Sequence, residues 1–303
     1  MPIYPNFYHT LVPCPIVELR GYAAACGLKG KLYAYLDFDG ATGTARDSLA
    51  EGMLALAAAS GKLKPGQTII EASSGAFGTA LTLAGLTAGY PVWLTMPEDA
   101  PAMRQEILLR MGAKILHSPA VSSLAGARAL AEKTAAEKGW FYMNWLANDD
   151  NPEYHRRVTG PAIAKAILQK DAPPLVDTIT ISVGSAGTLT GVGETLKGWT
   201  NDMRIVAVEP YESQALGGGF VGSHGIPDMG FGIVPGNYNS YVVDNIAAVT
   251  SNDATRAAQR VLRTDAIPAS PSAGAALHAA AQLIANRTSR NALVIFGGRQ
   301  NIL

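Results

Sequence analysis

The chain has 303 residues, of which 48% are hydrophobic and 16% charged, and its formal net charge is zero. This composition is typical of a compact α/β protein rather than a disordered or fibrous one, and the length favours two lobes. No basic stretch is present to neutralise a phosphate backbone, no apolar run reaches ~18 residues, and no signal-peptide pattern is visible. We therefore expect a cytoplasmic protein without a nucleic-acid or membrane partner.

Apolar runs typical of strands alternate with Ala- and Leu-rich runs typical of helices. Strands are expected over Lys31–Phe38, Thr68–Glu71, Pro91–Met96, Lys114–Ser118, Phe141–Asn144, Thr178–Val183, Ile205–Val208 and Ala292–Phe296. Helices are expected over Ser48–Ser60, Gly75–Ala88, Ala102–Met111 and Ala125–Lys138, with further helices between the later strands. This alternation predicts an α/β protein with mainly parallel sheets and right-handed crossovers.

The composition changes near Ala147–Pro152, where we expect the chain to cross between lobes. The smaller lobe would then contain residues 38–149, and the larger lobe residues 1–37 plus 150–303. The stretch Gly217–Asn239 is rich in Gly, Pro and Asn and is longer than an ordinary connector, so it predicts either a lid over a cleft or a subunit contact. The two cysteines are too few for a disulfide framework, and no Cys/His spacing indicates a metal site.

Two strand–turn–helix segments have the small residues of an anion-binding turn. The later one contains Gly184, Ser185, Ala186, Gly187 and Thr188. Backbone N–H groups at its helix start could hold a phosphate, with hydroxyls from Ser185 and Thr188, although a tight structural turn explains the pattern equally well. The earlier one contains Ser73, Ser74, Gly75, Ala76 and Phe77, and its N–H groups would hold a carboxylate as readily as a phosphate.

Ser272 stands just before an Ala-rich helix. Spacing alone favours an N-cap role for it. The alternative is that its hydroxyl donates to a pyridine nitrogen and leaves that nitrogen uncharged.

These motifs, with several others, resemble in order those of the fold type II family of enzymes that use pyridoxal phosphate (PLP), especially cysteine synthase and cystathionine β-synthase. The matching segments are Thr42–Asp47 (lysine turn), Ser73–Gly78 (substrate loop), Asn151–His155 with Thr159–Pro161, Gly184–Thr188 (phosphate loop), Gly230–Gly232 with Pro235–Asn237, and Ser272–Ala276. The resemblance extends from about Cys14 to Gly298 and covers nearly the whole chain.

The resemblance implies a homodimer of two-lobed chains and a small amino-acid substrate. It implies that Gly184–Thr188 binds the cofactor phosphate and that Ser272 contacts the pyridine nitrogen. It also implies that Ser73–Phe77 and Gly232 line the substrate site. The reaction implied is β-elimination from serine or O-acetylserine, followed by addition of a nucleophile.

The chain departs from the family pattern where the cofactor aldehyde would lie. Arg46 occupies the position of the Schiff-base lysine. A guanidinium stays charged, with a pKa above ~12, and is neither an amine nucleophile nor a base. Ala76 replaces an asparagine that reaches the cofactor, and Phe77 replaces a small polar residue and would fill part of the pocket.

Three hypotheses follow from these departures. The chain is an active PLP enzyme with altered chemistry, in which PLP is held non-covalently or enters as a preformed imine with an amino acid and Arg46 binds an anionic group. Alternatively, it is a catalytically degenerate homologue that binds PLP, another anion or a partner. In the third hypothesis, Arg46 is an engineered substitution made to trap a complex. The accompanying changes at Ala76 and Phe77 disfavour this hypothesis.

Overall fold

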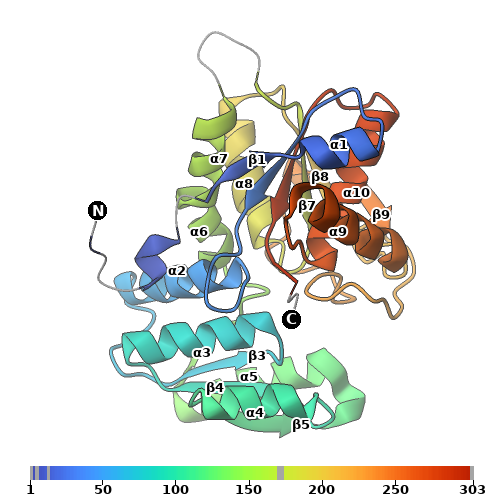
Figure 1. Ribbon diagram of the computed structural model, residues 1–303. Helices are drawn as coiled ribbons and strands as arrows, with labels where there is room; N and C mark the ends of the chain where they lie inside the picture. The colour runs from blue at the N-terminus through green and yellow to red at the C-terminus, as the bar shows by residue number, and fades with distance from the viewer. Residues whose placement is uncertain (1–2, 4–6, 12–13, 169–173, 301–303) are drawn as a thin grey trace. The chain divides into compact units, whose positions relative to one another are not determined.

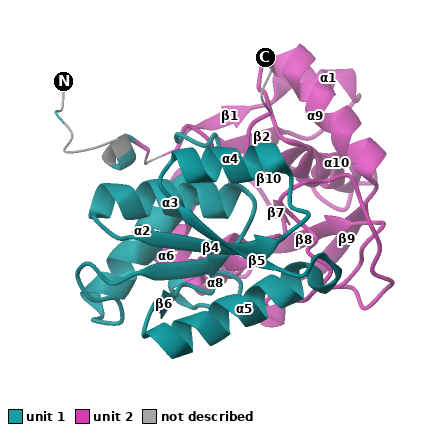
Figure 2. Cartoon of the chain, turned by 90° about the horizontal axis from the view of Figure 1, so that it is seen from below, with its two compact units in different colours: residues 1–10, 40–150 teal, residues 11–39, 151–303 magenta. Residues whose placement is uncertain are grey.

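The computed structural model describes residues 3, 7–11, 14–168 and 174–300. The chain forms two compact units, one of residues 1–10 and 40–150 and the other of residues 11–39 and 151–303 (Figure 2). Among the described helices, none is long and apolar enough to cross a membrane.

The smaller unit is built on a four-stranded parallel sheet with the order β5-β4-β3-β6 (Figure 1). Ala127 and Ala131 of one helix share a buried cluster with Ile70 and Ala72 of the sheet, because small side chains allow close packing. The elements are β3 (Ile69–Ala72), β4 (Val92–Pro97), β5 (Lys114–Ser118), β6 (Phe141–Tyr142), α2 (Arg46–Ala59), α3 (Ala76–Ala88), α4 (Ala102–Arg110), α5 (Ser123–Lys138), η1 (Phe7–Thr10) and η2 (Ala120–Ser122).

The larger unit is built on a six-stranded sheet with the order β1-β2-β10-β7-β8-β9. Its strands are parallel except β1, which pairs with β2 in the antiparallel sense. The elements are β1 (Ile16–Glu18), β2 (Leu32–Leu36), β7 (Thr178–Ser182), β8 (Arg204–Pro210), β9 (Asn245–Val249), β10 (Ala292–Phe296), α1 (Arg20–Ala25), α7 (Thr159–Ile167), α8 (Gly187–Trp199), α9 (Ser251–Asp265), α10 (Pro271–Ala285) and η3 (Ser240–Val242). Helix α6 (Asp150–Arg157) contains the boundary between the units.

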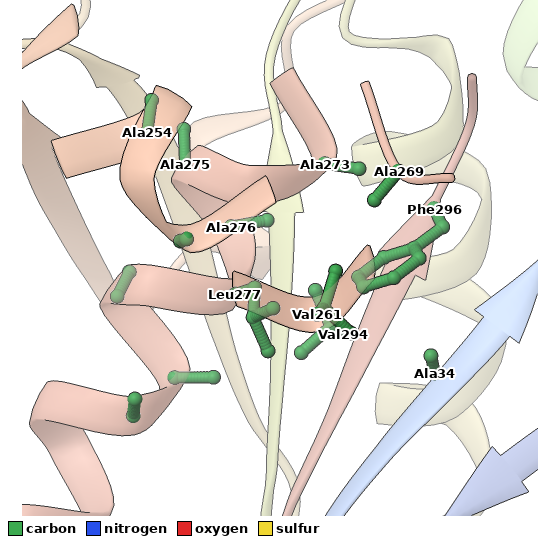
Figure 3. Packing of buried hydrophobic residues seen from close by; sticks show 14 of the residues in the cluster. Ala34, Ala254, Val261, Ala269, Ala273, Ala275, Ala276, Leu277, Val294 and Phe296 are labelled. Atoms are coloured by element: carbon green, nitrogen blue, oxygen red, sulfur yellow. The ribbon is translucent and has the colours of Figure 1, made fainter. Parts of the chain in front are cut away.

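Successive side chains along each strand point to opposite faces of this larger sheet, and both faces are buried. On β10, Phe296 and Val294 belong to a cluster with residues of α1, α9 and α10, whereas Leu293 and Ile295 belong to a second cluster with residues of α7 and α8. Figure 3 shows Leu277 of α10 within the first cluster. The sheet is therefore covered by helices on both faces, as is typical of parallel sheets.

The predicted α/β architecture is confirmed, and the expected elements have ends that differ from the observed ones by at most two residues. One expected strand is too long, because Asn144 adopts a left-handed φ of 47° and the chain leaves the sheet after Tyr142. Strands β1 and β9 were not predicted. The first has only three residues, and the second is largely exposed and so lacks an apolar run.

Leu277 is fully buried in the core of the larger unit, so its truncation should leave a cavity and lower stability. We expect Leu277→Ala to lower the free energy of unfolding of that unit by about 2–5 kcal/mol, since it removes apolar contacts and leaves a void. Denaturant unfolding measures this change. Val121→Ala is the control, because Val121 is 93% exposed and its truncation should cost less than about 0.5 kcal/mol. Equal effects of both substitutions would contradict the packing described.

Candidate functional site

The later anion turn lies at the carboxyl edge of the six-stranded sheet. Strand β7 ends at Ser182, and α8 begins at Gly187 and continues for 13 residues. The N–H groups in the first turn of a helix have no carbonyl partner within that helix, and the helix dipole makes this end partly positive. The turn can therefore bind an anion with backbone groups alone.

Close approach by neighbouring segments explains the glycines of this turn. A Cβ added at Gly187 would overlap the side chain of Asn151, and one added at Gly184 would lie 2.7 Å from the carbonyl oxygen of Asp228. The N–H of Gly230 also donates to the carbonyl of Val183 at 3.0 Å. These contacts bring the segment that carries Gly232 beside the turn.

Two asparagines hold the turn from outside. The side-chain amide of Asn151 donates to Ser185 Oγ at 3.0 Å, and that of Asn237 donates to the Ser185 carbonyl at 3.2 Å. Because Ser185 Oγ accepts the Asn151 hydrogen bond, its own proton is left to donate elsewhere. Sequence reasoning had assigned neither asparagine a role, although both stand in motifs that carry the family resemblance.

Thr188, the second residue of α8, contacts a buried histidine. Its Oγ1 lies 3.1 Å from Nε2 of His155, whose Nδ1 lies 2.9 Å from Thr159 Oγ1. Burial lowers the pKa of His155 to about 3, so the ring is neutral at ordinary pH. The ring of His155 therefore connects the anion turn to Thr159.

The predicted N-cap role of Ser272 is wrong. The cap of α10 is Ser270, whose Oγ accepts from the N–H of Ala273 at 3.3 Å, while Pro271 occupies the first helical position. Ser272 follows, and its Oγ lies 2.9 Å from Ser270 Oγ. The N-terminus of α10 is tied to the carboxyl side of β10, because the N–H of Ser270 donates to the carbonyl of Gly298 at 3.0 Å.

In the smaller unit, a buried carboxylate organises the turn that contains Arg46. Asp47 Oδ2 accepts from the N–H and the hydroxyl of Thr42 at 2.9 and 2.8 Å. Gly43 has a φ of 71°, which favours glycine, and a Cβ at Gly40 would overlap Asp47. Arg46 is half-buried and is the first residue of α2. The turn is therefore built without a lysine.

The earlier anion turn, at the start of α3, is partly occupied by its own serine. Ser73 Oγ accepts from the N–H groups of Gly75 and Gly78 at 3.3 and 3.0 Å. Fewer N–H groups therefore remain for a carboxylate, among them those of Ala76 and Phe77 in the first turn of α3. Ser74 also lines a cavity of about 200 Å³ within the smaller unit.

The Phe77 ring packs against an aromatic neighbour. It is 1% exposed and stacks on Trp145 with ring centroids 4.4 Å apart and planes inclined by 8°. The N–H of Trp145 donates to Glu71 Oε2 at 2.9 Å, and the N–H of Ala72 donates to Glu71 Oε1 at 2.6 Å. Burial raises the pKa of Glu71 to about 8, against the opposing effect of these two hydrogen bonds.

The larger unit fits the phosphate and pyridine ends of PLP. A glycine cradle at a helix N-terminus with two hydroxyls suits a phosphate, and Ser272 places a hydroxyl at the start of a second helix. Position 46, which the sequence resemblance matches to the family lysine, carries the guanidinium of Arg46. Among the described residues, no group of three or more His, Cys, Asp or Glu side chains could hold a metal ion.

The backbone of the later turn predicts that one substitution is stabilising. Ala186 has a φ of 65°, where a Cβ is strained and glycine is not. We expect Ala186→Gly to raise the free energy of unfolding by about 1 kcal/mol in chemical denaturation. The matched control is Ala166→Gly at an exposed position of helix α7, which should lower the free energy of unfolding by up to about 1 kcal/mol. A destabilising Ala186→Gly would contradict the left-handed conformation.

The buried carboxyl group of Glu71 predicts a pH dependence. Its folded-state pKa of about 8 lies above its ordinary value of 4.5, so the native chain keeps a proton that the unfolded chain releases. Stability should therefore fall as pH rises between these values. We expect Glu71→Gln to flatten this slope, measured by unfolding at several pH values. Glu106→Gln on exposed α4 is the control, and an unchanged slope in Glu71→Gln would contradict the prediction.

Comparison with known proteins agrees with this geometry. The family model of pyridoxal-phosphate dependent enzymes matches residues 9–298. A cysteine synthase of Staphylococcus aureus is 34% identical over 268 residues, which are 88% of this chain and 84% of that protein. The crystal structure of a cysteine synthase from Entamoeba histolytica has a TM-score of 0.89 and 31% identity, covering 98% of this chain and 88% of that one.

A second similar structure is a lysine-to-alanine mutant of O-ureido-L-serine synthase with O-ureido-L-serine bound. Its TM-score is 0.88 at 28% identity, and the alignment covers 98% of this chain and 91% of that one. The family match covers most of the chain, and together with the cysteine synthase relatives it implies PLP as the cofactor. The chain belongs to the family of pyridoxal-phosphate dependent enzymes and is similar to cysteine synthases.

Proposed function

We propose that this protein binds PLP without a covalent bond to any of its lysines and acts on a serine- or O-acetylserine-type amino acid by β-elimination or β-replacement. The observation that carries the proposal is the glycine cradle at the start of α8, which can bind the cofactor phosphate although the lysine position holds Arg46. When bound, PLP supplies an electron sink that stabilises negative charge next to the amino group of its substrate.

The residues of this chain have binding and orienting roles in the proposal. The first-turn N–H groups of α8 and the hydroxyls of Ser185 and Thr188 would bind the phosphate. Ser272 would donate to the pyridine nitrogen, and the free N–H groups of Ala76 and Phe77 would bind the amino-acid carboxylate. Arg46 would bind an anionic group, since a guanidinium cannot act as a base at ordinary pH.

The lysine-to-alanine mutant of O-ureido-L-serine synthase supports this proposal. Its structure is described as O-ureido-L-serine-bound, so a related chain that has lost a lysine can still hold an amino acid. By analogy, we propose that the loss of the lysine at position 46 leaves binding intact.

A catalytically degenerate PLP- or anion-binding homologue is the second candidate. The observation that favours it is the hydroxyl of Ser73, which accepts two N–H groups of the turn proposed to bind the substrate carboxylate. An engineered lysine-to-arginine variant is disfavoured, because a single trapping substitution would not also change Ala76 and Phe77. We further propose a cytoplasmic homodimer, as the family resemblance implies.

The first test of the proposed function is the absorption spectrum of the purified protein with saturating PLP, followed by borohydride reduction and peptide mass spectrometry. We expect visible absorbance from bound cofactor and no PLP adduct on any lysine. An adduct on Lys31 or any other lysine would contradict binding without a covalent bond. Loss of all cofactor absorbance after removal of excess PLP would exclude the cofactor site.

Restoring the amine tests whether position 46 faces the cofactor aldehyde. We expect Arg46→Lys to form an imine with PLP that borohydride reduces to a permanent adduct at that position, because the turn is already built around Asp47. Arg46→Gln is the matched control and should gain none. If Arg46→Lys carries no adduct, the proposed placement of this turn at the aldehyde end is wrong.

Pyruvate release from O-acetylserine separates the catalytic proposal from the binding homologue. The catalytic proposal predicts release by the wild type, whereas the binding homologue predicts none from the wild type or from Arg46→Gln.

A further inference from the structure

The buried ring of His155 links two threonine hydroxyls in the larger unit. It is 1% exposed, with Nδ1 at 2.9 Å from Thr159 Oγ1 and Nε2 at 3.1 Å from Thr188 Oγ1. A neutral imidazole carries one proton, so one of its nitrogens donates and the other accepts. Two arrangements of the three groups are therefore possible, and they leave the Thr188 hydroxyl in different states.

The environment of Thr159 decides between these arrangements. Thr159 is 2% exposed, and within the described part of the chain the Nδ1 atom is the only hydrogen-bond partner of its hydroxyl. If Nδ1 carried the proton, the Thr159 hydroxyl would accept and its own proton would be buried without an acceptor. Such a loss disfavours that arrangement by about tenfold. The Thr159 hydroxyl therefore donates to Nδ1, and the ring proton is on Nε2.

The consequence reaches the start of α8. Nε2–H donates to Thr188 Oγ1, so the proton of Thr188 is not used by the ring and can donate to a ligand. We propose that His155 is a positioning residue which orients the Thr188 hydroxyl as a donor to the phosphate of PLP. In the reverse tautomer, Nε2 would accept the hydrogen bond from the Thr188 hydroxyl. The Thr188 oxygen would then present only lone pairs to the ligand, and these repel an anion.

This inference rests on the proposed function, because the phosphate of PLP is the anion. It also explains why the position suits histidine. The ring spans two hydroxyls and offers one acceptor and one donor without a net charge, since burial keeps the pKa of His155 near 3. A leucine at the same position would fill space but leave both threonines without their partner.

The tautomer is measured on the ligand-free protein with ¹⁵N-labelled histidine by long-range ¹H–¹⁵N correlation. The His155 signals are assigned by their absence from His155→Gln. We expect a protonated Nε2 and an unprotonated Nδ1 that do not change between pH 5 and 8. A proton on Nδ1, or a ring that titrates in this range, would overturn the inference.

Binding of PLP, measured by equilibrium dialysis, tests the coupling to Thr188. Thr188→Val should weaken binding by about tenfold or more, and Thr188→Ser by much less. In the wild-type background, His155→Leu should weaken PLP binding by a similar factor. In the Thr188→Val background, the same substitution should weaken PLP binding by less than about twofold. The effects should not add, because the two residues are in contact and act as a unit. His155→Gln, which retains a donor and an acceptor, should recover most of the affinity and keeps the test valid if His155→Leu does not fold.

The outcomes separate this inference from the proposed function. If PLP binds the wild type but the His155 and Thr188 effects add independently, the positioning role is wrong and the proposed function stands. If PLP does not bind the wild type, the proposed function fails and the role of His155 toward PLP fails with it, whatever tautomer the spectra show.

Discussion

The N–H groups in the first turn of α8 are the feature on which the proposed site in the larger unit depends. They lie at the carboxyl edge of a parallel sheet, where ligands of α/β proteins commonly bind. Asn151 and Asn237 hold Ser185 from two sides, and Gly187 is so closely approached by Asn151 that no Cβ fits. The proposed anion would explain why polar groups and glycines gather in this turn.

A buried aspartate holds the turn that carries Arg46 in the smaller unit. Asp47, which is fully buried, accepts two hydrogen bonds from Thr42 just before α2. Phe77 stacks on Trp145, whose N–H is bound by the buried carboxyl group of Glu71. Arg46, Ala76 and Phe77, the positions at which we propose altered chemistry, thus lie on formed helices of the smaller unit.

The sequence predicted the α/β class and most strands because buried parallel strands are short apolar runs. It missed β9 because Asn245–Val249 is an edge strand with mostly exposed side chains. It predicted the anion turn from its glycines but could not show why they are needed, since Asn151 and Asp228 are distant in sequence from Gly187 and Gly184. The role of His155 was missed for the same reason, and Ser272 was mistaken for a cap because Ser270 offers the same chemistry two residues earlier.

The central claim is that the loop at α8 binds a phosphate without help from a lysine. The most direct measurement is ³¹P NMR of PLP added to the wild-type protein at equimolar concentration. The account predicts a shifted or broadened phosphate resonance, and a smaller shift or less broadening in Thr188→Val at the same concentrations. A resonance indistinguishable from free PLP with the wild type, or a bound resonance unaffected by Thr188→Val, would contradict the account.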